Sequence, residues 1–369
     1  MKLLIQIIRI FVGVLFIFSG LVKAIDPHGL SYKMQEYFDL WGMSSFNSYT
    51  LWMSILMIAA EIIAGAALLI GWRAKLINWF LLLLIVFFTF LTGYSYLSGK
   101  FKNCGCFGDC IPITAQQSFY KDIILLVLIL ILFFASKYIK PIFSKKVTNI
   151  LLIVSIMFSF AVQWYALKNL PIVDCLGYKK GAYIPSQMQV PANAIPDSVV
   201  INYVYKKDGK EVAFSADAFP EDFDDSTYQF VKRDDIVVRA GKNNTPPIKG
   251  FVLENENKED QVPTILAMPK VYILFVEDEQ TKFEHWKEKM ENLYQEMQAK
   301  AIPLYIVTAN YAPVKSILQN SKLKDVALLQ GDRVMIRTAS RANPTLYLIE
   351  KGTIKDKWSS ANFNQVFNQ

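Results

Sequence analysis

The sequence predicts a membrane-embedded bundle of five helices followed by an α/β domain outside the bilayer, and three observations support this fold class. Of the 369 residues, 53% are hydrophobic and only 19% are charged, a composition typical of membrane proteins. The apolar residues gather in five runs in the first half of the chain, and each run has about the 20 residues that a helix needs to cross a bilayer. After Pro171 the sequence becomes charged and contains short runs typical of strands.

The five predicted membrane helices begin close to the N-terminus. A cleaved signal peptide is the alternative for the first run, but Arg9 within it and four further runs favour a retained helix. The runs are Leu3–Val22, Leu51–Trp72, Leu76–Leu97, Phe119–Tyr138 and Asn149–Leu167.

The orientation follows from the basic residues in the short loops. If the N-terminus is cytoplasmic, the segment 136–146 is cytoplasmic too, and it carries four lysines and no acid. We therefore predict a multi-pass protein of the bacterial inner membrane with a cytoplasmic N-terminus and a periplasmic C-terminal domain. The lipid bilayer is then its first partner, and the net charge of +7 requires no nucleic acid.

The half of the chain outside the membrane divides into two predicted regions. Residues 171–246 form a β-rich linker region, with a hairpin that turns at Asp208-Gly209. Residues 247–369 alternate strand, helix and strand and end in a second hairpin, "NPTLYLIEKGTIKDKWS". This order predicts a parallel βαβ unit extended by antiparallel strands.

The order of elements in 247–369 resembles the thioredoxin fold. Pro344, in Asn343-Pro344 before "TLYLIEKG", matches the cis-proline of thioredoxin-like proteins. The active-site cysteines of that family would follow "VYILFV", where this chain has "EDEQTKF". Because disulfide exchange needs a thiolate, the resemblance implies a degenerate domain that binds or scaffolds.

The first part of the chain resembles two related membrane families. "RIFVGVLFIFSGLVKAIDPHG" and "AAEIIAGAALLIGW" are similar to DoxX-like proteins, and "NCGCFGDC" before "SFYKDIILL" resembles the methylamine-utilisation MauE branch. The resemblance implies a four-helix bundle over 1–138 and an anchor helix over 139–170. "LPIVDCLGYKKGAYIP" is similar to a linker in Bacteroidetes proteins that fuse this bundle to a thioredoxin-like domain, and the resemblance implies thiol or electron handling.

Four cysteines are the candidate redox or structural site: Cys104, Cys106, Cys110 and Cys175. All four fall at the predicted periplasmic side, where disulfides form. In the first interpretation Cys104 and Cys106 are an exchanging pair, with Cys110 or Cys175 resolving a mixed disulfide. In the second, Cys104 or Cys106 pairs with Cys110, and Cys175 ties the fifth helix to the loop. A metal site is the least favoured interpretation, and we predict none.

Three ionisable residues lie within the predicted spans. Lys23 is near a helix end, where its long side chain can extend to the interface. Arg9 and Glu61 differ by only several Å in predicted depth, at a rise of about 1.5 Å per residue. They form either an ion pair that fixes helix packing or a site for protons or a quinone head group; a quinone is the only cofactor that the sequence brings into question.

Two functions are compatible with these features, and they leave open whether the protein is an enzyme. The first is a membrane thiol/disulfide oxidoreductase or electron-transfer accessory that uses the Cys104-Gly105-Cys106 loop. The second is a non-enzymatic assembly factor, chaperone-like, whose outer domain binds a periplasmic or exported client and whose cysteines are structural.

Overall fold

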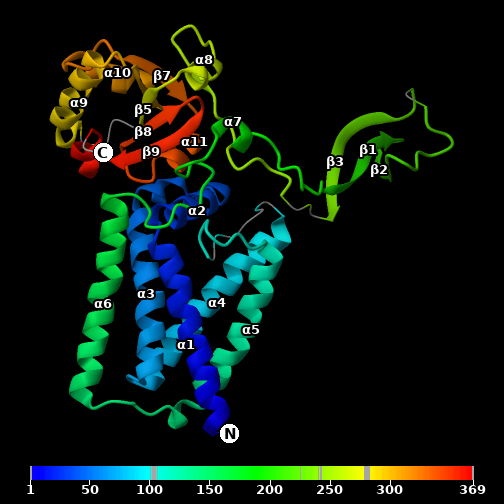
Figure 1. Ribbon diagram of the computed structural model, residues 1–369. Coiled ribbons are helices and arrows are strands. Elements are labelled where there is room, and N and C mark those ends of the chain that lie inside the picture. Colours follow the sequence, from blue (N-terminus) through cyan, green and yellow to red (C-terminus); the bar gives the residue numbers. More distant parts are fainter. Residues whose placement is uncertain are drawn as a thin grey trace.

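The computed structural model describes residues 2–99, 101, 105, 107–224, 226–239, 241, 243–277 and 283–367. Five helices in the first half are long and apolar enough to cross a membrane, as the sequence predicts. They bring the described part of the loop 99–114, here called the cysteine loop, to the same end of the bundle as the C-terminal domain (Figure 1). We call this end the outer end. The helices are α1 (Lys2–Ala24), α3 (Thr50–Ile70), α4 (Ala74–Ser98), α5 (Ala115–Phe134) and α6 (Lys145–Lys168).

Glycines bring α1 and α3 into close contact. A Cβ atom on Gly13 would lie 2.6 Å from the side chain of Leu69, and one on Gly20 would lie 2.5 Å from the side chain of Ile62. A Cβ atom on Gly65 would lie 2.7 Å from the carbonyl oxygen of Gly13. Small residues allow membrane helices to approach each other in this way. The contact fixes the antiparallel register of the two helices.

The apolar core of the bundle lies between α1, α3, α4 and α5, with residues such as Val12, Leu68, Leu81 and Ile129 fully enclosed. Helix α6 lies at the side of the bundle and packs mainly against α3 (Figure 1). The fold is therefore a four-helix core with a fifth, peripheral helix. The short 3-10 helix η2 (Ser136–Tyr138) follows α5.

The segment between α1 and α3, which lies outside the five predicted spans, contains helix α2 (Pro27–Leu40) and the 3-10 helix η1 (Ser44–Tyr49). Asp26 caps α2, because its side chain accepts a hydrogen bond from the backbone N–H of Gly29, and Pro27 occupies the start of the helix. Helix α2 lies across the outer end of the bundle, beneath the C-terminal domain (Figure 1). Its mixed polar and apolar sequence lacks the long apolar run of a spanning helix.

The outer domain consists of residues 248–367 with the segment 176–187 packed against it. Its six-stranded sheet has the order β4-β7-β6-β5-β8-β9, in which β5, β6 and β7 are parallel and β8 and β9 form the predicted antiparallel hairpin. This confirms the predicted α/β order. The strands are β4 (Leu253–Glu254), β5 (Val271–Val276), β6 (Leu304–Thr308), β7 (Ala327–Gly331), β8 (Thr345–Glu350) and β9 (Thr353–Ser359).

Helices cover both faces of this sheet. All six residues of β5 are buried, because alternate side chains point to opposite faces. Val271, Ile273 and Phe275 belong to the core under α8 and α11, and their neighbours belong to the core under α9 and α10. The helical elements are α7 (Ile184–Gln187), α8 (Val262–Ala267), η3 (Phe283–His285), α9 (Lys287–Ala299), α10 (Tyr311–Gln319), α11 (Arg333–Ala339) and η4 (Ser360–Gln365).

A separate three-stranded sheet projects sideways from the outer domain (Figure 1), and we call it the pendant sheet. It contains β1 (Ser198–Lys207), β2 (Lys210–Ser215) and β3 (Gln229–Arg239) in the order β2-β1-β3. Asp208 and Gly209 both have positive φ, 51° and 82°, as the predicted tight hairpin turn requires. The chain leaves the outer domain after Gln187 and returns at Ile248, whose N–H donates to the Gln187 carbonyl at 2.9 Å.

Candidate functional site

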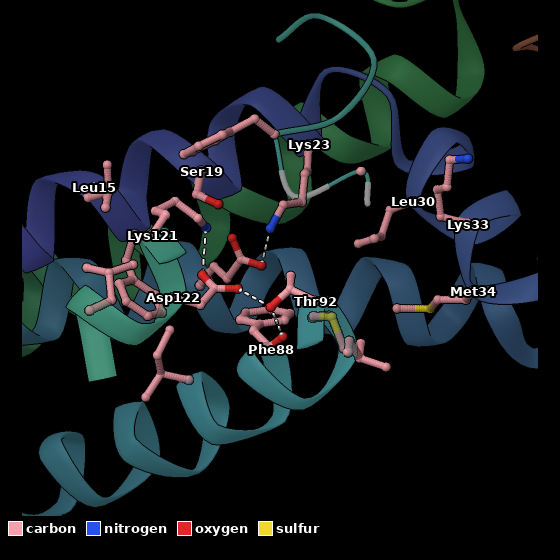
Figure 2. A pocket seen from close by; sticks show the side chains of 18 of the residues that line it. Leu15, Ser19, Lys23, Leu30, Lys33, Met34, Phe88, Thr92, Lys121 and Asp122 are labelled. Carbon is pink, nitrogen blue, oxygen red and sulfur yellow. Dashed lines mark hydrogen bonds and ion pairs between the residues drawn. The ribbon is translucent and has the colours of Figure 1, made fainter. Parts of the chain in front are cut away.

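A cavity of about 60 Å³ lies inside the bundle near its outer end, between α1, α2, α3, α4 and α5. Most of its wall is apolar, but Figure 2 shows the side chains of Lys23, Thr92, Lys121 and Asp122 directed into the space between the helices. Gly105 and Phe107 of the cysteine loop also line it. A cavity of this size and polarity can hold a few water molecules. The cavity therefore joins the cysteine loop to charged groups within the membrane part.

The first charged pair in the cavity is Lys23–Glu61. The Lys23 ammonium donates a hydrogen bond to Glu61 Oε1, and the two side chains are 4% and 1% exposed. Lys23 Nζ also lies 5.1 Å from the centre of the Phe88 ring. Among the described residues, nothing hydrogen-bonds to Glu61 Oε2. The expectation that Lys23 extends to the interface is wrong, since the glycine contact sets Gly20 beside Glu61 and directs Lys23 inward.

The second charged pair joins α5 to α4. Lys121 Nζ lies 2.7 Å from Asp122 Oδ1, and the Thr92 hydroxyl donates to Asp122 Oδ2 at 3.0 Å. The Asp122 side chain is 1% exposed. Lys121 Nζ also lies 4.9 Å from the centre of the Phe107 ring, so this pair contacts the cysteine loop directly.

Arg9 takes no part in this site, and its predicted pairing with Glu61 is wrong. Its guanidinium donates to the carbonyl oxygens of Leu68 at 2.8 Å and Leu69 at 2.6 Å, and so it satisfies the C-terminal end of α3. The antiparallel register sets Gly20 beside Glu61, and Arg9 lies eleven residues before Gly20, about 16 Å along the helix. That distance exceeds the reach of an arginine side chain.

The cysteines divide into two groups. Cys104 and Cys106 lie outside the described residues. Cys110 and Cys175 form a disulfide with a Cα–Cα distance of 4.9 Å. This corrects the alternative in which Cys110 pairs within the cysteine loop, because the segment after α6 returns across the outer end and brings Cys175 to Cys110. Among the described residues, no group of three or more His, Cys, Asp or Glu side chains is arranged to hold a metal ion.

The outer domain meets the bundle at the edge where thioredoxin-like proteins carry their active site. The Asn343–Pro344 peptide bond is cis, and the Asn343 side chain accepts a hydrogen bond from the backbone N–H of Glu277 at 3.0 Å. The stretch 278–282, where the sequence lacks the family's cysteines, lies outside the described residues. Glu277 Oε2 lies 3.4 Å from the hydroxyl of Tyr32 on α2. This edge therefore faces helix α2.

Comparison with known proteins finds a family match for the first part of the chain. Residues 1–135 match the family model described as Methylamine utilisation protein MauE. The membrane portion from α1 to α5 is MauE-like. The chain is also 34% identical over 130 residues to protein TlpB of Flavobacterium psychrophilum, a match that covers 34% of the chain and 35% of TlpB, about a third of that relative's length. Residues 199–240, within the pendant sheet, match a domain of unknown function (DUF8463). No solved structure matches the chain.

Sequence reasoning missed three residues of the MauE-like portion that line the cavity: Thr92, Lys121 and Asp122. Asp122 is an acid only a few residues inside the span that begins with Phe119. An acid inside an apolar span indicates a polar partner, so this signal was present in the sequence. Nothing in the sequence pairs Asp122 with Thr92, because that contact depends on how α4 and α5 pack.

Proposed function

We propose that this protein is a membrane thiol/disulfide accessory protein that acts on the periplasmic side of the bacterial inner membrane, with Cys104 and Cys106 as the exchanging pair. One observation carries this proposal. Gly105, between the two cysteines, and Phe107, directly after them, line a cavity that two ion pairs with buried carboxylates also line. A redox loop above polar groups that can exchange protons is a suitable arrangement for dithiol chemistry.

The proposed reaction has two steps, reduction of the loop disulfide by a client and its reoxidation. A client dithiol is oxidised to a disulfide while the Cys104–Cys106 disulfide is reduced to two thiols by thiol–disulfide exchange. Reoxidation of the two loop thiols releases two electrons and two protons. The electron acceptor that we propose is a lipid-soluble quinone, which becomes a quinol when it takes up both. No protein group in the exchange is consumed.

The residues of the cavity suit the proton part of this reaction. Glu61 has a buried carboxylate oxygen without a hydrogen-bond donor among the described residues, so it can accept a proton or a hydrogen bond from water. Lys121 connects the cysteine loop, through Phe107, to Asp122.

Acid-quenched thiol labelling of the full chain in native membranes tests the proposal. We expect Cys104 and Cys106 to show a mixture of reduced and oxidised states that shifts towards reduced when quinone is depleted. The matched control is the Cys110–Cys175 pair, which should stay oxidised under both conditions. A Cys104–Cys106 pair that stays uniformly oxidised and resists reductant would refute the proposal.

A second candidate function is that of a non-enzymatic assembly factor that binds a periplasmic or exported client. The Cys110–Cys175 disulfide favours it, because this bond joins the cysteine loop to the segment that enters the outer domain, as a structural bridge would. Under this proposal, Cys104→Ser together with Cys106→Ser leaves client maturation in cells unchanged. Loss of maturation in that variant excludes the binding-only function.

A further inference from the structure

Two arginines at one edge of the outer domain, Arg337 and Arg341, hold this domain on α2. Arg337 Nε donates to Glu277 at 2.5 Å, and Arg337 Nη1 donates to the side-chain oxygen of Gln35 on α2 at 2.7 Å. The guanidinium groups of Arg337 and Arg341 lie 5.1 and 5.2 Å from the ring centre of Tyr32. One aromatic side chain of α2 is therefore in contact with both arginines.

Arg341 makes the contact that matters for the cysteine loop. Its Nη2 lies 2.7 Å from Asp109 Oδ2, and its Nε lies 3.1 Å from Asp26 Oδ2. The Arg341 side chain is 7% exposed. Burial disfavours its charge, but Asp26 and Asp109 outweigh burial and raise the pKa of Arg341. The guanidinium is thus a buried cation that bridges two carboxylates.

The two carboxylates come from the two segments that border the cavity. Asp26 lies three residues after Lys23, at the outer end of α1, and Asp109 lies directly before Cys110 in the cysteine loop. Gly29 leaves the space in which they meet, since a Cβ atom there would lie 3.1 Å from Asp26 Oδ2 and 3.3 Å from Asp109 Oδ2. Arg341 neutralises two acids that would otherwise repel each other.

A second anchor acts on the next residue of the loop. Cys110 is bonded to Cys175, and Asp174, directly before Cys175, forms an ion pair with Lys357 on β9. Burial lowers the pKa of Lys357, and Asp174 opposes this effect. Asp109 is therefore tied to the outer domain by its ion pair with Arg341, and Cys110 is bonded to a segment that the Asp174–Lys357 ion pair ties to the same domain.

We propose that Arg341 is a positioning residue: by holding Asp109, it keeps the neighbouring part of the cysteine loop, which includes Phe107, against the cavity. The inference rests on the proposed function, because it assigns Arg341 to the chemistry of Cys104 and Cys106. It also gives the edge of the outer domain that carries Glu277 and Pro344 a partner: the chain's own membrane portion. A client then reaches the cysteines by another surface.

The test uses the full chain in membranes and compares Arg341→Gln, Arg341→Lys and Asp109→Asn with wild type. The first readout is the equilibrium between dithiol and disulfide at Cys104–Cys106 in glutathione redox buffers. We expect Arg341→Gln and Asp109→Asn to change this equilibrium constant by about tenfold or more. A change of that size corresponds to the loss of one charge-assisted hydrogen bond. Arg341→Lys should recover part of the shift, since it keeps the charge but loses the fork geometry.

Arg333→Gln is the matched control, because Arg333 is an exposed arginine of α11, the helix that precedes Arg341, and bonds to Asn310 within the outer domain. This variant should leave the equilibrium unchanged. The second readout is the rate at which an impermeant reductant opens Cys110–Cys175. We expect Arg341→Gln to raise it about tenfold. Wild-type values of both readouts in Arg341→Gln would overturn the inference. If only the second readout responds, and Cys104–Cys106 never changes state in wild type, the proposed function fails. The anchoring of the cysteine loop by Arg341 then still holds.

Discussion

Removing one member of the Lys23–Glu61 pair should destabilise the bundle more than removing both. The two side chains are 4% and 1% exposed, so a lone charge left in their place is removed from bulk water. We take Lys23→Met and Glu61→Met as the single changes, because methionine is similar in length to both residues and packs easily in apolar surroundings. The double variant replaces the pair by two apolar side chains.

The size of the effect follows from the cost of neutralising the remaining group. At pH 7 a carboxyl needs about 3.7 kcal/mol to hold a proton, and an ammonium needs about 4.6 kcal/mol to lose one, from their solution pKa values. Each value is an upper limit on the loss of stability in the corresponding single variant. If burying the lone charge costs more free energy than neutralising the group, the group becomes neutral instead. The Phe88 ring, 5.1 Å from Lys23 Nζ, offsets about 1 kcal/mol in Glu61→Met.

We therefore expect each single variant to lose about 3 to 4 kcal/mol, and the double variant to lose about 1 kcal/mol or less. Thermal unfolding in detergent measures the loss, which corresponds to a fall of about 6 to 16 °C in the melting temperature of each single variant. The amount of folded protein in the membrane should follow the same order. If the effects of the two single changes simply add in the double variant, the two residues are not coupled and the reasoning fails.

The control is the exposed pair Lys232–Asp234 on the pendant sheet. Its Nζ–Oδ2 distance is 2.8 Å, but its side chains are 56% and 43% exposed. Water screens such pairs, so Lys232→Met should lower the melting temperature far less than Lys23→Met does. A loss as large as that of Lys23→Met would mean that the assay responds to charge in general.

Three further predictions concern the outer end. Cys110→Ser and Cys175→Ser should each remove the same bridge, which spans 65 residues, and lower the free energy of unfolding by about 4 kcal/mol; a variant that keeps the oxidised wild-type mobility on a non-reducing gel contradicts the pairing. Burial, with help from Arg341, lowers the pKa of His28 to about 4, whereas an unfolded histidine titrates near about 6.5. The unfolded state then binds more protons between these values, so thermal stability should fall as the pH drops from about 6.5 to about 4. The fall should be smaller in His28→Asn, and parallel pH curves would exclude this role. An impermeant maleimide should label the reduced cysteine loop in intact spheroplasts, whereas labelling only after lysis would reverse the proposed orientation.

The parts of the fold that the sequence predicted are those set by local patterns. The length of an apolar run alone indicates a spanning helix, and the five spans are present. The alternation of buried strands such as Val271–Val276 with amphipathic helices indicates a parallel sheet, and that order is also present. The turn at Asp208-Gly209 depends on two residues only.

The site depends on contacts that no local pattern encodes. Depth along a span suggested Arg9 as the partner of Glu61 and left Lys23 at the interface, whereas the register of α1 against α3 pairs Lys23 with Glu61. That register comes from glycines that pack against a distant helix. In the same way, the bond from Cys110 to Cys175 depends on where the chain returns after α6. Helix α2 was missed because its sequence is amphipathic and short.

The hydrogen bond between Gln187 and Ile248 closes the point at which the chain leaves the outer domain and returns to it. The residues between these positions leave and re-enter the outer domain at one point, so they form an insertion whose ends are already closed. Loop closure then adds little entropic cost however long the insertion is. The pendant sheet is free to change in sequence, to be exchanged or to be excised and replaced by a short turn, while the sheet β4–β9 and the membrane bundle keep every contact described above.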